Sequence, residues 1–189
     1  MMNYYTGKRL FDIILSIILL ICLSPIFLII AFIIRIQDGG SSIFRQERIG
    51  KKGVVFRFYK FRSMPLSTPN VESKETKKLQ ITPFGKFIRR TNLDELPQFY
   101  NVLKGDMSFI GPRPPIPSQT ELIELRRMNG ALQLSPGLTG WAQVNSFDGM
   151  SFSEKAKFDG EYASKISFGF EFLILLKTIN YFTKKPPTY

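Results

Sequence analysis

The chain has 189 residues, of which 26 are Lys or Arg and 15 are Asp or Glu, so its formal net charge is +11. This length suits one catalytic domain with an anchor, and the basic excess indicates an anionic partner: nucleic acid, a lipid surface or a phosphorylated substrate. The chain has no histidine, which excludes the commonest general base and metal ligand. Its single cysteine, Cys22, excludes an intramolecular disulfide and a cysteine-rich zinc site, so we expect a cytoplasmic catalytic domain.

An uncharged apolar segment runs from Ile13 to Ile34. As a helix it would be about 33 Å long, enough to cross a bilayer core of about 30 Å. Ser24-Pro25 lies near its middle, where proline removes a hydrogen bond and bends a helix. Lys and Arg flank both ends, which favours the cytoplasmic side for both. Two topologies stay open: a re-entrant helix–break–helix, and a spanning helix with a proline kink.

The segment after the anchor predicts a β-hairpin with arms at residues 43–48 and 54–59 and a turn at 50–53. Residues 64–80 contain two prolines and many polar residues, which predicts a mobile surface loop. Thr82-Pro83 then predicts the start of a short helix that ends at Arg90.

A second helix is predicted from Asn92, a cap followed three residues later by Glu95, to Lys104, with Gly105 as its end. The proline-rich residues 111–115 predict a rigid turn. A short polar helix is expected at 121–128, and a loop at 135–145. Residues 168–182 are apolar with two charges, and they either pack on the core or lie in a membrane interface.

Two adjacent carboxylates, Asp94 and Glu95, lie in the predicted first turn of the second helix, where the helix dipole favours their ionised forms. An ionised Asp can attack phosphorus as a nucleophile. Such a pair can also bind Mg²⁺ together with substrate phosphates. Helix capping alone would also account for the pair, so the dipeptide by itself does not decide its role.

Basic residues gather in the neighbouring segments, and they are candidate phosphate ligands because Arg binds phosphate with two donors and Lys as a point charge. These candidates are Lys60, Arg62, Arg89 and Arg113. Arg113 is the best placed of them, because flanking prolines reduce the entropy lost when it is positioned. The alternative for each is an ordinary solvated surface charge. The chain contains no GxxxxGK, GxGxxG or HExxH motif, so the usual ATPase, dinucleotide and zinc-protease assignments have no support.

Six segments, in this order along the chain, resemble the bacterial sugar transferases, the monotopic phosphoglycosyl transferases that start O-antigen, capsule, exopolysaccharide and glycoprotein glycan assembly. They are Lys8–Asp12 ahead of the Ser24-Pro25 helix, Tyr59–Met64, Leu93–Gln98, Asn101–Ser108, Gly111–Pro114 and Pro136–Asn145. The resemblance covers most of the chain, and six ordered motifs are far more specific than any one of them.

The resemblance implies that a sugar-1-phosphate passes from a UDP-sugar to undecaprenyl phosphate, with release of UMP. It implies Asp94 as the covalent nucleophile, Glu95 as its partner in Mg²⁺ binding or proton handling, and Lys60, Arg89 and Arg113 as phosphate ligands. Arg62 stays a candidate phosphate ligand from its place in the basic cluster alone.

The residues themselves suggest a nucleotide-sugar loop, because the Gly-containing segment 137–141 can bring backbone N–H groups and an aromatic face near a nucleotide. Its candidate residues are Thr139, Gly140 and Gln143, although a Gly-containing loop alone is weak evidence.

The expected fold class is α+β: a re-entrant membrane helix broken at Ser24-Pro25, a small β-hairpin, and several short or amphipathic helices. Residues 1–36 would form the anchor, and residues 37–189 a catalytic domain with interfacial helices on the cytoplasmic face of the bacterial inner membrane. Expected partners are a UDP-sugar, undecaprenyl phosphate, phospholipid and, from the family, a second copy of the chain; nucleic acid is not expected.

Two positions depart from the family pattern. Many relatives have Arg or Lys where this chain has Ser135, and Asn-Gly-Arg where it has Asn145-Ser146-Phe147. The identity of the sugar therefore stays open. Two alternatives to catalysis, suggested by the net charge and the aromatics, are a membrane-tethered nucleic-acid-binding protein and a scaffold that binds anionic lipid.

Overall fold

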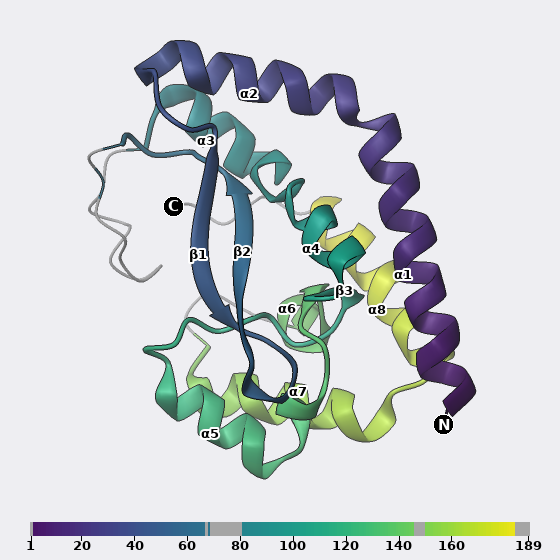
Figure 1. Cartoon of the computed structure of the whole chain (residues 1–189). Coiled ribbons are helices and arrows are strands. Elements are labelled where there is room, and N and C mark those ends of the chain that lie inside the picture. The colour runs from purple at the N-terminus through teal and green to yellow at the C-terminus, as the bar shows by residue number, and fades with distance from the viewer. Residues whose placement is uncertain (1, 67, 69–80, 146–149, 184–189) are drawn as a thin grey trace.

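The uncharged N-terminal segment forms two helices in the computed structural model, which describes residues 2–66, 68, 81–145 and 150–183. These are α1 (Met2–Cys22) and α2 (Ser24–Asp38), bent by 61° relative to each other (Figure 1). Pro25 lacks the N–H that would bond to the carbonyl of Ile21, and the Ser24 hydroxyl donates to that carbonyl instead, at 2.8 Å. The predicted break at Ser24-Pro25 is therefore confirmed.

Among the described residues, no single helix is long and apolar enough to cross a membrane. The bent pair does have the required length and composition when its two helices are taken together. The structure thus agrees with the predicted helix–break–helix, while its topology relative to a membrane stays a prediction.

The predicted hairpin is confirmed as β1 (Ile43–Ile49) and β2 (Val55–Phe61), joined by the short 3-10 turn η1 (Lys51–Gly53). The strands pair antiparallel, with Phe44 opposite Lys60 and Gln46 opposite Phe58. Because side chains alternate along a strand, these four residues point to the same face of the hairpin. That face is the one on which the candidate site lies.

The helix α3 (Pro83–Arg90) begins where predicted, with the Thr82 hydroxyl accepting from the N–H of Gly85 at 2.9 Å. The single helix predicted at 93–104 is wrong. A 3-10 turn, η3 (Leu93–Glu95), is followed by α4 (Gln98–Lys104), because Pro97 between them supplies no N–H for a continuous helix.

The predicted capping box is also wrong. Asn92 is in the left-handed conformation, with φ 54°, and its side chain makes no capping hydrogen bond. Gly105, in contrast, ends α4 as predicted, with φ 99°.

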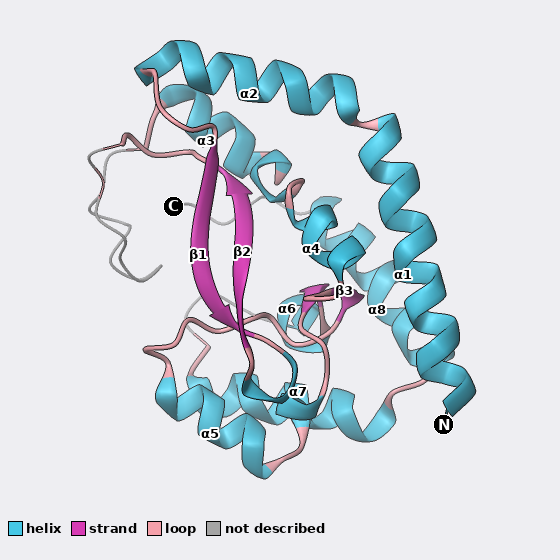
Figure 2. Cartoon of the chain, viewed as in Figure 1, coloured by secondary structure: helices cyan, strands magenta, loops and turns pink. Residues whose placement is uncertain are grey.

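The second half of the chain contains β3 (Ser108–Ile110), α5 (Thr120–Met128), the 3-10 turn η4 (Ala131–Gln133), β4 (Gly137–Thr139), α6 (Trp141–Asn145), α7 (Phe152–Lys165) and α8 (Phe168–Thr183). The α5 prediction is confirmed. The predicted loop at 135–145 is wrong, because β4 pairs in parallel with β3 and α6 follows directly. Figure 2 shows how few strands there are among the helices. The α+β class is confirmed.

The helix α7 was not predicted, although the sequence carries its signal. Ser151 and Glu154 form a reciprocal capping box at its start. The predicted mobile loop at 64–80 lies mostly outside the described residues.

The N-terminal helix is tied to the rest of the molecule by the charged residues that precede its apolar part. Arg9 donates to the carbonyls of Val102 and Leu103 at the end of α4, at 2.6 and 2.7 Å. Lys8 donates to a backbone carbonyl of β3 and pairs with Glu171 of α8. Lys8 and Arg9 therefore bind the anchor helix to the folded domain, in addition to any role as the flank of a membrane segment.

The helix α8 packs on the core with one side and exposes an apolar face on the other, so it combines features of the two alternatives that the sequence left open. Ile174 is fully buried in the core cluster that contains Phe58 and Val102. An exposed apolar face remains on the other side of the helix, formed by Phe168, Phe172, Leu176 and Ile179.

One buried amide joins the hairpin to α4. Asn101, fully buried, accepts from the N–H of Tyr59 at 3.1 Å and donates to the carbonyl of Arg57 at 2.6 Å. It also donates to Asp106 at 3.2 Å. The amide therefore fixes β2, and with it Lys60, relative to the segment that carries the carboxylate pair.

We predict that Asn101→Ala lowers the free energy of unfolding by about 2–3 kcal/mol, because it leaves buried backbone groups of β2 unpaired. Thermal unfolding should then shift by roughly 5–10 °C. Gln133→Ala, at an exposed position, is the matched control and should shift the midpoint little. An unchanged midpoint in Asn101→Ala would show that the amide does not hold the hairpin.

Candidate active site

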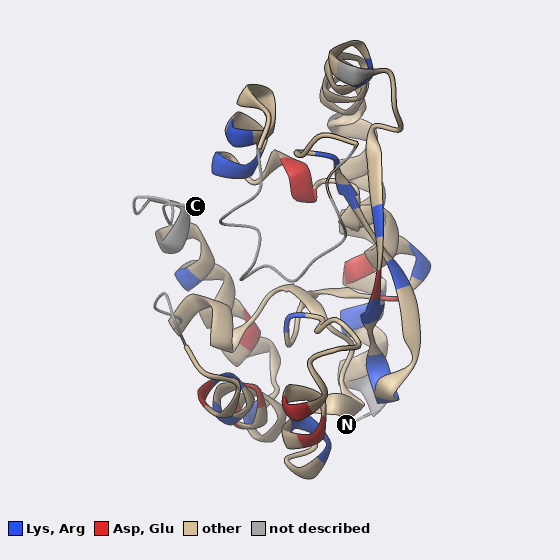
Figure 3. Cartoon of the chain, turned by 90° about the vertical axis from the view of Figure 1, so that its left-hand side faces the viewer, with Lys and Arg blue, Asp and Glu red and all other residues tan. Residues whose placement is uncertain are grey.

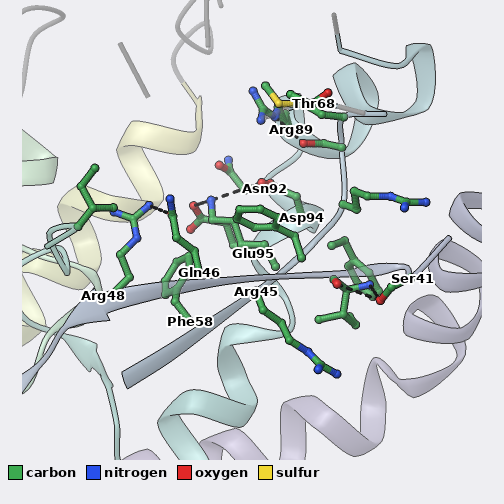
Figure 4. Close-up of a pocket in the computed structure, with 18 of the residues that line it drawn as sticks. Ser41, Arg45, Gln46, Arg48, Phe58, Thr68, Arg89, Asn92, Asp94 and Glu95 are labelled. Carbon is green, nitrogen blue, oxygen red and sulfur yellow. Dashed lines mark hydrogen bonds and ion pairs between the residues drawn. The ribbon is translucent and has the colours of Figure 1, made fainter. Parts of the chain in front are cut away.

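A cavity of about 780 Å³ lies against the hairpin face described above. All six residues predicted as catalytic or phosphate-binding line it: Lys60, Arg62, Arg89, Asp94, Glu95 and Arg113. They come from β2 and the residue after it, from α3 and the neighbouring η3, and from the proline-rich turn, so three separate parts of the sequence meet here. Figure 3 shows acidic residues flanked by basic ones on neighbouring elements, and Figure 4 shows the side chains around the cavity.

The ammonium group of Lys60 contacts both carboxylates. Its Nζ lies 2.6 Å from Glu95 Oε1 and 3.4 Å from Asp94 Oδ2. Arg113 adds a second cation to Glu95, with Nη2 3.3 Å from the same Oε1. Glu95 is therefore engaged by two cations, whereas Asp94 has one longer contact.

The surroundings shift the pKa values of the two carboxyl groups in opposite directions. Burial raises the pKa of Glu95, but Lys60 and Arg113 outweigh it and lower this pKa to about 2. Burial also raises the pKa of Asp94, with a further contribution from Glu95, while Lys60 and Arg89 oppose the rise. Glu95 is thus a fixed anion near neutral pH, which suits holding cations better than carrying protons.

The 3-10 turn buries the Asp94 side chain while leaving it at the cavity wall. Only 6% of Asp94 is exposed. Such a carboxylate is poorly hydrated and little engaged by donors, and both properties leave its oxygens available for an electrophile or a metal ion.

At the other end of the cavity, Arg89 is held by a residue that sequence reasoning did not select. Its Nε donates to Ser63 Oγ at 2.7 Å, and Ser63 is buried. Arg62 lines the same end, and its backbone N–H donates to the carbonyl of Ser42. Ser63 belongs to the 59–64 motif, so its position in that motif was the available signal.

Sequence reasoning also missed Gln46 and Arg48 on β1, which line the cavity beside Phe58. Arg48 Nη2 donates to Gln46 Oε1 at 2.6 Å, and the guanidinium carbon lies 5.2 Å from the centroid of the Phe58 ring. Burial and the nearby Arg113 lower the pKa of Arg48 to about 10. The hairpin register was the available signal, because it places this pair on the face of Lys60.

The structure does not bring the predicted nucleotide-sugar loop to this cavity, as far as its described lining shows. The Thr139 hydroxyl bonds to that of Thr178 at 2.8 Å, and Gln143 donates to the carbonyl of Leu138 at 3.3 Å. A Cβ on Gly140 would clash with the Gly111 carbonyl. These contacts support the small parallel sheet, so a nucleotide role for Thr139, Gly140 and Gln143 stays a prediction. Phe147 lies outside the described residues.

The donor set bears on the expected Mg²⁺. No cluster of three or more metal-ligating side chains occurs in the described part of the chain. Two adjacent carboxylates still fit this ion, which commonly binds one or two protein carboxylates and completes its shell with substrate phosphates and water. Asp94 and Glu95 are that pair, and Asp94 is the less occupied of the two.

Comparison with known proteins agrees with this geometry. The model of the family described as bacterial sugar transferase matches residues 3–185. The chain belongs to the bacterial sugar transferase family. It is therefore a transferase, and the two non-catalytic alternatives suggested by its net charge gain no support.

Among the relatives of this sugar transferase, two have different sugars in their names. It is 35% identical to the exopolysaccharide production protein ExoY of Sinorhizobium fredii, over 92% of this chain and 84% of the relative. It is 40% identical to the galactosyl transferase CpsE of Streptococcus agalactiae, over 94% of this chain and 42% of the relative. It is 38% identical to the UDP-glucose:undecaprenyl-phosphate glucose-1-phosphate transferase of Escherichia coli, over 91% of this chain and 39% of the relative.

We predict a pH-dependent effect of Glu95→Gln on stability, measured in buffer containing EDTA. The pKa of Glu95 in the folded protein, about 2, lies below that of an unfolded chain, about 4.3. The ionised form therefore stabilises the fold above about pH 5, and this contribution is lost as the pH falls through 4 towards 2. At pH 7 the variant should melt roughly 3–6 °C lower, because charge-assisted bonds are lost.

The difference between wild type and Glu95→Gln should then narrow as the pH is lowered. Glu124→Gln is the control, since Glu124 lies on the surface of α5 in a pair with Arg127. A difference in melting temperature that stays constant down to about pH 3 would contradict the assignment of Glu95 as the strongly ionised partner.

Proposed function

We propose that this sugar transferase moves a sugar-1-phosphate from a UDP-sugar to undecaprenyl phosphate and releases UMP. The observation that carries the proposal is the buried Asp94, beside Glu95, in a cavity lined by Lys60, Arg89 and Arg113. The name of the Escherichia coli relative supports both the donor class and the lipid acceptor. The reaction would initiate assembly of a surface polysaccharide or a glycoprotein glycan.

In the first step, an oxygen of the Asp94 carboxylate attacks the β-phosphorus of the UDP-sugar. A bond forms between Asp94 and that phosphorus, and the bond from phosphorus to the oxygen that bridges to the α-phosphate breaks. The bridging oxygen leaves with the electron pair as part of UMP. The sugar stays on the phosphorus, so Asp94 carries a covalent phospho-sugar.

In the second step, an oxygen of undecaprenyl phosphate attacks the same phosphorus. The bond from phosphorus to Asp94 breaks, which restores the carboxylate and yields the undecaprenyl diphosphate sugar. Both nucleophiles attack as anions, so neither step needs a base to remove a proton from the nucleophile. A chain without histidine is compatible with such a reaction.

The cations divide the cavity between the two phosphate-bearing substrates. Lys60 and Arg113 lie beside the carboxylate pair, where they would neutralise the diphosphate of the donor. Arg62 and Arg89 line the end next to α2, since Ile88 of α3 packs in one cluster with residues of α2. That end would take the phosphate of the lipid.

Mg²⁺ would be held by Asp94 and Glu95 together with the diphosphate. When bound, it would neutralise the charge that develops on the leaving UMP. Lys60 contacts both carboxylates, so it would neutralise part of their charge beside the ion.

We place the enzyme in the bacterial inner membrane as a monotopic protein, with residues 37–189 on the cytoplasmic face. The bent, apolar α1–α2 pair supports this placement, and so does a lipid acceptor that resides in the bilayer. The exposed apolar face of α8 would lie at the phospholipid interface. A homodimer is compatible with this arrangement.

Asp94→Asn is predicted to reduce UMP release from a panel of UDP-sugars by at least about 10³-fold, because the amide cannot form the covalent phospho-sugar. Glu95→Gln should reduce it by about 10- to 100-fold, through misplacement of Lys60 and Arg113. Intact-mass spectrometry of wild type with the active donor and Mg²⁺ should detect the phospho-sugar adduct. Peptide mapping should locate this adduct at Asp94. Glu124→Gln should match wild type, and full turnover by Asp94→Asn would end the covalent model.

The membrane topology makes a separate prediction, tested with Asn3→Cys in a Cys22→Ser background. A membrane-impermeant maleimide should label this cysteine in inverted vesicles and not in intact spheroplasts, because a re-entrant anchor keeps the N-terminus in the cytoplasm. Glu124→Cys, on the surface of the catalytic domain, is the control and should behave identically. Labelling of Asn3→Cys in spheroplasts would instead establish a spanning helix.

A further inference from the structure

The proline-rich turn that carries Arg113 is held almost entirely through its carbonyl groups. Residues 112–115 contain three prolines, so the segment has a single N–H group and cannot form a helix or a strand ladder. All three prolines are buried, while the side chain of Arg113 is 50% exposed. Its carbonyls must therefore find donors elsewhere.

Each of the four carbonyls accepts a hydrogen bond from a different part of the molecule. The donors are Gly137 N for Pro112 at 2.9 Å, Arg126 Nη1 for Arg113 at 2.8 Å, Arg48 Nη1 for Pro114 at 3.1 Å, and Ile49 N for Pro115 at 2.9 Å. Two donors are backbone amides, and two are arginine guanidinium groups.

These bonds fix the torsion that proline leaves free. The pyrrolidine ring sets φ, but ψ can still rotate, and the direction of the carbonyl follows ψ. The carbonyl of Arg113 itself is held by Arg126 alone among the donors just named. Its orientation determines how the Arg113 side chain leaves the turn towards Glu95.

Arg126 is suited to this task by its own surroundings. It lies on α5 with 4% of its surface exposed, and it pairs with Asp159 of α7, which is 1% exposed. Nε and Nη2 of Arg126 both contact Asp159 Oδ2, at 2.8 and 2.6 Å, so Nη1 remains directed at the turn. A buried ion pair often adds little net stability compared with an apolar pair of similar volume. Stability alone therefore does not account for the pair of Arg126 and Asp159.

We propose that Arg126, oriented by Asp159, is a positioning residue that sets the direction of Arg113 through the main-chain carbonyl. This inference rests on the proposed function, since Arg113 must bind the donor diphosphate for its position to matter. Arg126 itself does not line the cavity, so it acts through the turn. A small displacement of a phosphate ligand is enough to weaken binding markedly, because the bond is directional.

The test uses the full-length protein in detergent with MgCl₂, and UDP as the probe, measured by isothermal titration calorimetry. The principal variant is the double substitution Arg126→Met with Asp159→Leu, which removes the donor without leaving a buried unpaired charge. Arg113→Ala and the triple variant complete a double-mutant cycle. Arg127→Met, the next residue on α5 and exposed, is the matched control, and thermal melts verify that every variant is folded.

We expect Arg113→Ala to weaken UDP binding about tenfold and the Arg126/Asp159 double variant to weaken it about three- to tenfold. The triple variant should bind within twofold of Arg113→Ala, because the clamp has no effect without the side chain that it positions. Arg127→Met should bind like wild type. Effects that multiply in the triple variant, or a double variant that binds like wild type, would overturn the positioning role alone. Failure of wild type to bind UDP would overturn the proposed function and this inference together.

Discussion

The contact of Lys60 with both Asp94 and Glu95 is the interaction on which the site depends. Two adjacent carboxylates that are largely buried repel each other, and only a cation between them keeps both in one place. Much of the surrounding structure fixes that cation. The hairpin register directs Lys60 to the cavity face, and Asn101 bonds the neighbouring Tyr59 to α4. The amide of Asn101 thus helps to set the position of Lys60, although Asn101 does not line the cavity.

Local patterns predicted those parts of the fold that short-range physics controls. The hairpin, α3 and the break at Ser24-Pro25 each follow from a turn, a cap or a proline within a few residues. The wrong predictions concern mainly segments whose secondary structure depends on a contact with a distant part of the chain. The strand β4 exists because it pairs with β3, about thirty residues earlier in the chain, and no signal within 135–145 indicates that partner. The split between η3 and α4 was foreseeable from Pro97, but the apolar spacing of 96–103 outweighed it.

In the candidate site, the charged residues proposed to act on the substrate were easier to predict than the residues that hold them in place. Every predicted catalytic and phosphate-binding residue lines one cavity. Charged residues from separate motifs have few other reasons to lie near each other, so residue type and motif were enough to select them. Gln46 and Arg48 were missed, since a strand residue carries no signal until its register is known. Ser63 was missed because a neutral side chain does not by itself suggest a site, although it lies in the 59–64 motif. Lys8 and Arg9 illustrate the reverse case: their charge suggested a membrane flank, while their bonds to β3, α4 and α8 also make them the joint between anchor and domain.

A strongly ionised Glu95 next to the proposed nucleophile has an electrostatic rationale. The cavity gathers more cations than carboxylates, and without an anion at its centre Lys60 and Arg113 would repel each other and turn towards solvent. Glu95 keeps them in place before the donor arrives. In the proposed reaction, the diphosphate of the donor would share these cations with Glu95, so little reorganisation would accompany its binding. The same arrangement leaves Asp94 with a single long contact to Lys60, so it is the carboxylate that we propose as the nucleophile. The two carboxyl groups therefore differ because the cations engage Glu95 more closely than Asp94, and the proposed division of roles rests on that difference.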